Sequence, residues 1–217
     1  MTAPLFETIE QPRLLKDGLG YGTAILNGFA LEMEVALIAD IRACAEVAPF
    51  RHMVTPGGFR MSVALTNCGA LGWITDRRGY RYSDIDPGSG IPWPAMPASF
   101  LELAKAAANA AGFSSFQPDA CLMNRYEPGA RLTLHQDKDE KDFSQPIVSV
   151  SLGLPATFLF GGIERSDGTT RISVIHGDVI VWGGPSRLSY HGISPLKEGT
   201  HPLLGSFRYN LTFRKAG

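Results

Sequence analysis

The sequence predicts an α+β protein in which two helices are followed by a closed antiparallel β-structure, a sandwich or barrel. Two amphipathic helical patterns lie in the first half of the chain, and after residue 116 the chain becomes a series of short apolar runs separated by turn residues. The counts of Gly (24) and Pro (15) are high, which favours many turns and many short strands. Seven such runs in about a hundred residues fit a jelly roll, whose mouth can hold a ligand.

The two predicted helices each carry one apolar face. The first spans residues 31–47 and is expected to cover a sheet with Leu31, Val35, Ile38, Ile41 and Ala45. The second spans residues 97–111 and ends at Gly112. Its predicted buried face consists of Phe100, Leu103, Ala107 and Ala111.

The remaining elements are predicted to be short. Residues 1–22 carry no functional signal, and residues 51–97 are rich in glycine, proline and aromatics, which indicates short strands and recognition loops. Pro128-Gly129 is predicted to form a hairpin turn between the first two strands of the β-structure. Strands are predicted at 120–127, 131–136, 147–153, 156–161, 171–175, 178–183 and 207–214.

Composition places the chain among soluble globular proteins. Its 217 residues fit one domain, and 44% hydrophobic with 19% charged residues excludes a disordered chain. No apolar run reaches the roughly eighteen residues of a membrane span, and the first residues lack a basic region followed by an apolar one. We therefore expect a cytoplasmic protein with no membrane partner, and nothing in the sequence suggests obligate assembly, so a monomer is expected. The three cysteines, Cys44, Cys68 and Cys121, show no CxxC spacing and are expected to be buried reduced thiols.

A basic aromatic segment lies within residues 51–82, although the net charge of the chain is only −1. The segment contains five arginines but only one acidic residue, Asp76. The arginines are interspersed with the aromatic residues Phe59, Trp73, Tyr80 and Tyr82. Arginine beside aromatic side chains can bind phosphates and stack on bases. Charge alone favours the simpler interpretation, a solvated basic surface.

The most informative motif is His135-Gln-Asp137 together with the distant His191. If residues 131–137 are extended, His135 and Asp137 point to the same side. A histidine from another strand would complete a two-histidine, one-carboxylate set, which suits non-haem Fe(II) and leaves positions open for oxygen and substrate. On spacing alone, surface histidines are an equally good interpretation. A second His-x-Asp, His176-Gly-Asp178, is predicted to be a turn.

The last predicted strand places polar residues on one face. Apolar residues alternate along this strand with the polar residues Arg208, Asn210, Thr212 and Arg214. If the polar face points inward, its two arginines are buried and need an anionic partner. A small dicarboxylate would supply one, because a guanidinium matches a carboxylate in a bidentate way. Asn124 and Tyr126 share a face of another strand and could complete such a pocket. The alternative is a structural pair with one of the acids Asp119, Glu127 and Asp178.

These residues, in this order, resemble the AlkB family of Fe(II)- and 2-oxoglutarate-dependent dioxygenases. The similarity covers roughly residues 25–216. It extends to Met53-Val-Thr-Pro-Gly-Gly58, Trp93-Pro-Ala-Met-Pro97 and Ile147-Val-Ser-Val-Ser-Leu-Gly153. Leu65 and the stretch 162–171 depart from the family pattern. We therefore expect the preference for, and the affinity toward, particular bases to differ.

The resemblance implies a double-stranded β-helix (jelly roll, cupin-like) core at 116–217, helices and a nucleotide-recognition lid at 25–115, and an N-terminal extension at 1–24. It implies Fe(II) as cofactor, held by His135, Asp137 and His191, with 2-oxoglutarate and molecular oxygen as co-substrates. The residues implied for 2-oxoglutarate are Asn124, Arg125, Tyr126, Arg208, Tyr209, Asn210 and Arg214. Those implied for the damaged base and its strand are Trp73, Tyr80, Arg81, Tyr82, Asp139 and Arg165, with His135 bordering the base.

The implied reaction is oxidative demethylation of alkylated bases such as 1-methyladenine and 3-methylcytosine in DNA, preferentially single-stranded, with RNA as a further substrate. The base must leave its stack to react, which is consistent with aromatic platforms in the basic segment. Two alternatives stay open at this point. One is the same cofactors with a protein or small-molecule substrate, and the other is a metal-free β-sandwich binding module.

Overall fold

The computed structural model describes residues 20–217, and its core is a sandwich of two antiparallel sheets. The larger sheet has the strand order β1-β10-β7-β12-β5-β2, and the smaller has the order β6-β11-β8-β9. A separate hairpin is formed by β3 and β4. The strands of the larger sheet are β1 (Thr23–Leu26), β2 (Ala64–Gly69), β5 (Ala120–Tyr126), β7 (Ile147–Gly153), β10 (Val179–Trp182) and β12 (Arg208–Arg214). The others are β3 (Gly72–Asp76), β4 (Gly79–Ser83), β6 (Leu132–His135), β8 (Ala156–Phe160), β9 (Thr170–Val174) and β11 (His191–Ile193).

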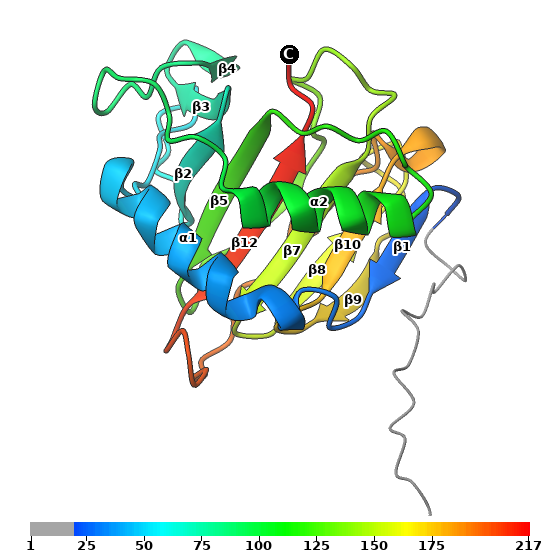
Figure 1. Cartoon of the computed structure of the whole chain (residues 1–217). Coiled ribbons are helices and arrows are strands. Elements are labelled where there is room, and N and C mark those ends of the chain that lie inside the picture. Colours follow the sequence, from blue (N-terminus) through cyan, green and yellow to red (C-terminus); the bar gives the residue numbers. More distant parts are fainter. Residues whose placement is uncertain (1–19) are drawn as a thin grey trace, which may run out of the picture.

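Two helices, α1 (Glu34–Val47) and α2 (Ala98–Ala110), lie across one face of the larger sheet (Figure 1). Short 3-10 turns, η1 (Leu31–Met33) and η2 (Gly184–Ser186), precede α1 and follow β10. One apolar core fills the space between the helices and the sheet, and a second fills the space between the two sheets. The central strand β7 is therefore buried along its whole length, since both of its faces are covered. This architecture confirms the predicted α+β class and jelly-roll core.

Helix α2 confirms its prediction, with Phe100, Leu103 and Ala107 buried and Gly112 at φ +92° just beyond its end. The predicted face of the first helix was partly wrong. Val35 is 75% exposed and Leu31 is 46% exposed. Ile38 and Ile41 are buried as predicted, and Leu37 and Cys44 complete the buried face. Leu31 departs from the prediction because residues 31–33 form a separate 3-10 turn that is not part of the α-helix.

The turn at Pro128-Gly129 exists, with Gly129 at φ +84°, but the hairpin prediction was wrong. Strand β5 belongs to the larger sheet and β6 to the smaller one, so the turn carries the chain between sheets. This crossover places the metal-ligand motif at the end of β6 opposite the inner face of β5. The prediction also missed β1 and β11, whereas the short strands expected within 51–97 are present as β2, β3 and β4.

Three further predictions concern the chain as a whole. Cys44, Cys68 and Cys121 are buried free thiols, as expected. The division at residues 24 and 115 stays a prediction; strands β1 and β2 pair with strands from beyond residue 116 in one sheet. Most of the proposed N-terminal extension lies outside the described residues. Within residues 20–217, none of the helices has the length and apolar character needed to span a membrane.

Candidate active site

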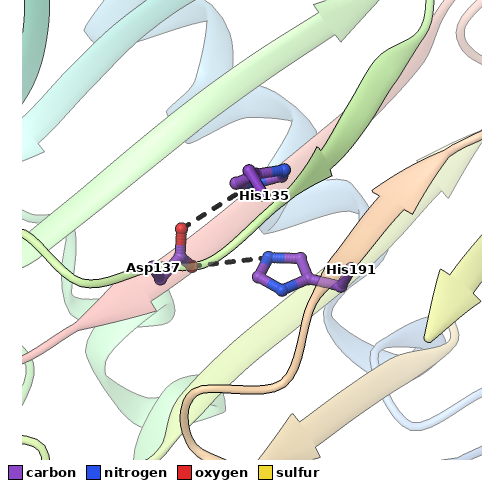
Figure 2. Close-up of side chains that lie close together, drawn as sticks. All are labelled: His135, Asp137 and His191. Atoms are coloured by element: carbon purple, nitrogen blue, oxygen red, sulfur yellow. Dashed lines mark ion pairs between the residues drawn. The ribbon is translucent and has the colours of Figure 1, made fainter. Parts of the chain in front are cut away.

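Three side chains meet between the two sheets at one end of the sandwich (Figure 2). His135 ends β6, His191 begins β11 directly opposite it, and Asp137 follows β6 by two residues. One ligand atom from each residue lies within 4.8 Å of the others. The Nε2 atoms of both histidines are 3.7 Å from carboxylate oxygens of Asp137. The sequence motif and the distant histidine therefore converge on one point.

The backbone fixes which nitrogen each imidazole offers. Nδ1 of His135 is 2.9 Å from the carbonyl oxygen of Thr133, and Nδ1 of His191 is 3.0 Å from that of Ser189. A carbonyl only accepts, so each Nδ1 carries the hydrogen and each Nε2 presents a lone pair. Orientation of a metal-binding imidazole through its other nitrogen is the usual arrangement in proteins.

The charges around the site favour the protonation states that a metal needs. Burial, reinforced by the neighbouring His135, lowers the pKa of His191 to about 4, so this imidazole is neutral near pH 7. Burial acts to raise the pKa of Asp137, but the Arg214 guanidinium and the two imidazoles outweigh it and hold that pKa below its usual range. Two imidazoles and one carboxylate leave the remaining coordination positions open, which suits non-haem Fe(II).

The two arginines of β12 confirm the predicted inward face, since Arg208 and Arg214 are both 5% exposed or less. Arg214 pairs with Asp137 at 2.7 Å and with Glu140 at 3.5 Å, not with the three acids considered from the sequence. Arg208 donates to the Ser151 hydroxyl at 3.0 Å, and its Nε and Nη1 atoms are buried without a hydrogen-bond partner among the described residues.

An unpaired buried guanidinium is costly, and a carboxylate of a small ligand would relieve it. Around it lie the side chains predicted to complete the pocket. Arg208 lies over the Tyr126 ring at 4.9 Å, and the Asn124 amide donates to Asn210 Oδ1 at 3.2 Å. The Asn124 Oδ1 atom is also buried without a partner in the described part of the chain. The residues present therefore fit a keto acid with a carboxylate at its far end.

Arg125 and Tyr209 do not face this pocket, in contrast to their predicted role. Each lies between two pocket residues on its strand, and alternation turns it to the opposite face of the sheet. There the Arg125 guanidinium lies 5.2 Å from the Phe50 ring and 5.0 Å from the Phe207 ring. Tyr209 packs beside the same two aromatic rings.

The hairpin β3–β4 lies over the cavity and brings aromatic residues to it. Trp73 and Tyr80 stack with ring centroids 5.6 Å apart and planes 16° apart. Trp73 Nε1 donates to Asp139 at 2.8 Å, which ties the hairpin to the metal-ligand loop. A cavity of about 790 Å³ is lined by these three residues, the metal-ligand set, Arg208 and Arg165.

Arg81 and Tyr82 also belong to β4 but do not line the cavity. Arg81 forms a bidentate pair with Asp76 of its own hairpin, at 2.8 and 3.0 Å. Tyr82 points inward and donates to Glu140 at 2.6 Å. The structure thus assigns both side chains to contacts within the protein.

The second His-x-Asp forms the predicted turn at Gly177, which has φ +89°. Asp178 accepts backbone hydrogens from Gly28 and Ile175, and His176 is 2.7 Å from Glu34. Neither residue approaches the three-ligand site.

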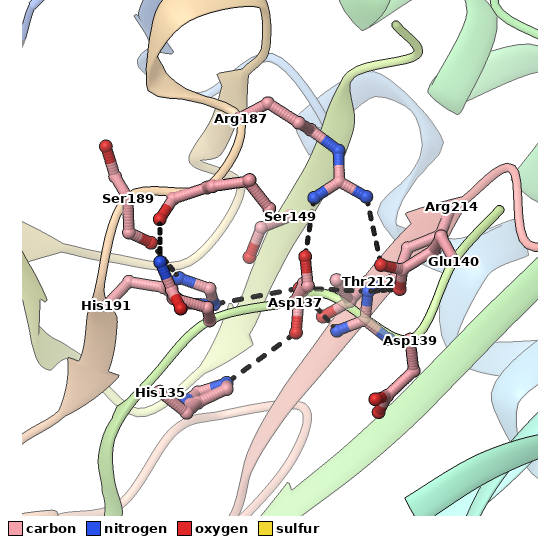
Figure 3. Close-up of polar contacts among 12 residues, drawn as sticks. His135, Asp137, Asp139, Glu140, Ser149, Arg187, Ser189, His191, Thr212 and Arg214 are labelled. Atoms are coloured by element: carbon pink, nitrogen blue, oxygen red, sulfur yellow. Dashed lines mark hydrogen bonds and ion pairs between the residues drawn. The ribbon is translucent and has the colours of Figure 1, made fainter. Parts of the chain in front are cut away.

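Sequence reasoning missed Glu140 and Arg187, which lie beside Asp137 (Figure 3). Arg187 donates to the Asp137 carbonyl and to the Glu140 carboxylate. Glu140 lies only three residues beyond Asp137, a position that could have drawn attention to it. Arg187 had no comparable signal, because its partners are about fifty residues away in the sequence.

The geometry is that of a two-histidine, one-carboxylate metal site beside a buried arginine with two unpaired nitrogens among the described residues. Comparisons with known proteins agree. The sequence profile of the 2OG-Fe(II) oxygenase superfamily matches residues 22–214. The alpha-ketoglutarate-dependent dioxygenase AlkB of Escherichia coli is 62% identical over 202 residues, covering 93% of this chain and 94% of that protein.

Two more distant relatives support the same assignment. A DNA N(6)-methyladenine demethylase of Arabidopsis thaliana, ALKBH1C, is 34% identical over 92% of this chain and 51% of its own length. The solved structure of OsALKBH1 superposes with a TM-score of 0.78 at 31% identity, covering 91% of this chain and 98% of that chain. The chain therefore belongs to the AlkB family within the 2OG-Fe(II) oxygenase superfamily. It is a dioxygenase that uses Fe(II), 2-oxoglutarate and oxygen.

Proposed function

We propose that this enzyme repairs alkylated bases in nucleic acid by oxidative demethylation, with release of formaldehyde and succinate. One observation carries the proposal. The three metal-binding side chains share a cavity with the unpaired guanidinium of Arg208 and with the stacked aromatic pair Trp73 and Tyr80. A metal, a keto acid and a planar base can thus be held side by side. The names of the E. coli and Arabidopsis relatives support this assignment.

The metal is held by His135, Asp137 and His191. When bound, Fe(II) would activate molecular oxygen, the oxidant of the reaction. One oxygen atom would enter succinate as 2-oxoglutarate loses carbon dioxide, and the other would hydroxylate a methyl group on a base nitrogen. The chain keeps both imidazoles oriented through Thr133 and Ser189. It also keeps the Asp137 carboxylate ionised, since the adjacent Arg214 stabilises the charged form.

The co-substrate is oriented by residues of β5 and β12. Arg208 pairs with its distal carboxylate through the nitrogens that have no partner within the described chain. The same cavity is lined by Asn124, Tyr126 and Asn210. Near the metal ligands, Arg214 holds the Asp137 carboxylate in place. These residues would hold the keto acid between Arg208 and the metal ligands.

The damaged base is held at the outer part of the cavity. Trp73 and Tyr80 offer an aromatic surface, with His135 on the metal side and Arg165 at the rim. A cationic 1-methyladenine or 3-methylcytosine is attracted to the aromatic faces and to the Asp139 carboxylate. The hydroxylated methyl group then leaves as formaldehyde. The base is not excised and the strand is not cut.

The preferred substrate is single-stranded DNA, with RNA as a second substrate, because an unpaired base reaches the cavity without the cost of extrusion. The exposed cations Arg60, Arg131, Lys138 and Arg165 line the cavity and attract the phosphate backbone. We further propose that the enzyme acts as a monomer in the cytoplasm.

The direct test is incubation with Fe(II), 2-oxoglutarate and a single-stranded oligonucleotide carrying one 1-methyladenine, analysed by mass spectrometry. The expected result is loss of the methyl group with one formaldehyde and one succinate per lesion. The unmethylated oligonucleotide and a methylated peptide serve as controls. Iron-loaded enzyme that leaves every methylated oligonucleotide unchanged would refute the proposal.

A further inference from the structure

Four buried charged residues form a network that includes one metal ligand: Asp137, Glu140, Arg187 and Arg214 (Figure 3). Each of these side chains is less than 10% exposed. Two carboxylates and two guanidinium groups balance one another. Because a buried charge is costly without its partner, the positions of all four groups depend on each other.

Arg187 joins the segment before His191 to the segment that carries Asp137. Its Nη1 donates to the Asp137 carbonyl at 2.8 Å, its Nη2 to Glu140 at 3.1 Å and its Nε to the Gln145 carbonyl at 3.0 Å. Arg187 lies four residues before His191, so one rigid guanidinium group links the loops that bear two of the three ligands.

The network also extends to the hairpin over the cavity. Tyr82 of β4 donates its hydroxyl hydrogen to Glu140 Oε1 at 2.6 Å. Glu140 contacts Arg187 through Oε2 and Arg214 through Oε1, and Arg214 holds the Asp137 carboxylate. A continuous chain of polar contacts thus runs from β4 to a metal ligand.

We propose that Tyr82, Glu140 and Arg187 are positioning residues that couple the β3–β4 hairpin to the metal centre. Metal binding fixes the Asp137 carboxylate, which orders Arg214 and Glu140 and thereby holds Tyr82 and its hairpin in place. By thermodynamic linkage, an ordered hairpin raises the affinity for the metal by the same factor. This inference rests on the metal site of the proposed function and extends it to the lid.

The test measures backbone amide hydrogen exchange of the full chain with and without Mn(II), in the absence of nucleic acid. In the wild-type protein, Mn(II) is expected to slow exchange in β3 and β4 by about 5-fold or more. In Tyr82→Phe this protection is expected to disappear. The control is Thr75→Val, which also removes one hydroxyl from the hairpin, where it donates to the Val54 carbonyl at 3.2 Å, away from the network.

A merely structural role of Tyr82 would change exchange equally with and without the metal, so the metal-dependent difference is the decisive readout. Calorimetry provides a second measurement. Glu140→Gln and Arg187→Met are expected to weaken Mn(II) binding by about 10- to 100-fold, with partial recovery in Arg187→Lys. Wild-type protein that binds no Mn(II) would refute the metal site itself. Mn(II) binding without hairpin protection, or equal protection in Tyr82→Phe, would refute only the coupling.

Discussion

Two clusters in this molecule each contain two histidines and one carboxylate, but only one of them presents imidazole lone pairs to a metal. His135, His191 and Asp137 meet at the end of the sandwich, with imidazole centroids 4.4 Å apart. His176, His201 and Glu34 meet elsewhere, with imidazole centroids 4.3 Å apart. Each cluster gathers two histidines and one carboxylate from at least two separated parts of the chain. The residue types alone therefore do not decide which cluster binds a metal.

The difference lies in the group that faces the Nδ1 atom. In the first cluster each Nδ1 faces a carbonyl, which leaves both Nε2 lone pairs free. In the second cluster His176 Nδ1 accepts the backbone hydrogen of Gly153 at 2.9 Å, so its Nε2 carries the proton and donates it to Glu34 at 2.7 Å. The first arrangement is ready for a metal, whereas the second uses the imidazole as a bridge between α1 and the turn before β10.

The largest expected effect distinguishes the clusters directly. His191→Ala removes a ligand and is expected to weaken Mn(II) binding by more than about 100-fold, beyond the loss typical of a residue that only supports a ligand. His201→Ala, its counterpart in the other cluster, is expected to leave the affinity unchanged. Isothermal titration calorimetry of both variants checks this. Similar losses in the two variants would mean that the comparison is wrong.

Under the proposed function, 2-oxoglutarate binds beside the first cluster only, through Arg208, which lines the same cavity. Arg208→Met removes the guanidinium that lacks a carboxylate partner within the described residues. Loss of a charged hydrogen bond predicts about 10- to 100-fold weaker binding of 2-oxoglutarate to the Mn(II)-loaded protein. Because a buried unpaired charge is also removed, the free energy of unfolding should stay constant or rise. Titration calorimetry and urea unfolding measure the two quantities, and unchanged 2-oxoglutarate binding would contradict the assignment.

The second cluster is expected to affect stability instead. Glu34→Gln weakens the contact with His176, and we expect the free energy of unfolding to fall by about 1 kcal/mol, the usual value for one hydrogen bond. Mn(II) affinity should not change. Urea unfolding followed by circular dichroism measures the first quantity. If Glu34→Gln lost Mn(II) binding but kept its stability, the roles assigned to the two clusters would be contradicted.

The smallest expected effect is a pH dependence in the second cluster. Burial, reinforced by the neighbouring His176 and opposed by Glu34, lowers the pKa of His201 below its usual 6.5. The unfolded chain therefore binds more protons than the folded one as the pH falls below about 6.5, and the free energy of unfolding decreases in that range. His201→Gln should show a shallower decrease than the wild-type protein in urea unfolding at several pH values. A steeper decrease would contradict the sign.

Local alternation predicted the His135 and Asp137 part of the metal site, whereas the choice of His191 over surface histidines came from the resemblance to a family. Two-residue alternation places His135 beside Asp137, and the same alternation correctly predicted the buried face of Arg208 and Arg214. Applied consistently, it would also have excluded Tyr209 and Arg125 from the pocket. The resemblance to a family included these residues as part of a motif, although they face the other side of the sheet.

What the sequence did not predict depends on long-range contacts. The bridging role of Arg187 follows from its placement beside Asp137, which no local pattern records. The crossover at Pro128-Gly129 reads as a hairpin, because sequence does not show which sheet receives the next strand. The tautomers that distinguish the two clusters depend on backbone N–H and C=O groups, which every residue except proline carries, so the sequence does not show which of them faces an imidazole.

The most direct test of the central claim is X-ray diffraction from crystals of the full chain grown with Mn(II), with data collected to locate manganese by its anomalous signal. The predicted result is one strong peak between Nε2 of His135, Nε2 of His191 and the Asp137 carboxylate, with none at His176 and His201. A peak at the second cluster, or none at the first, would contradict the account.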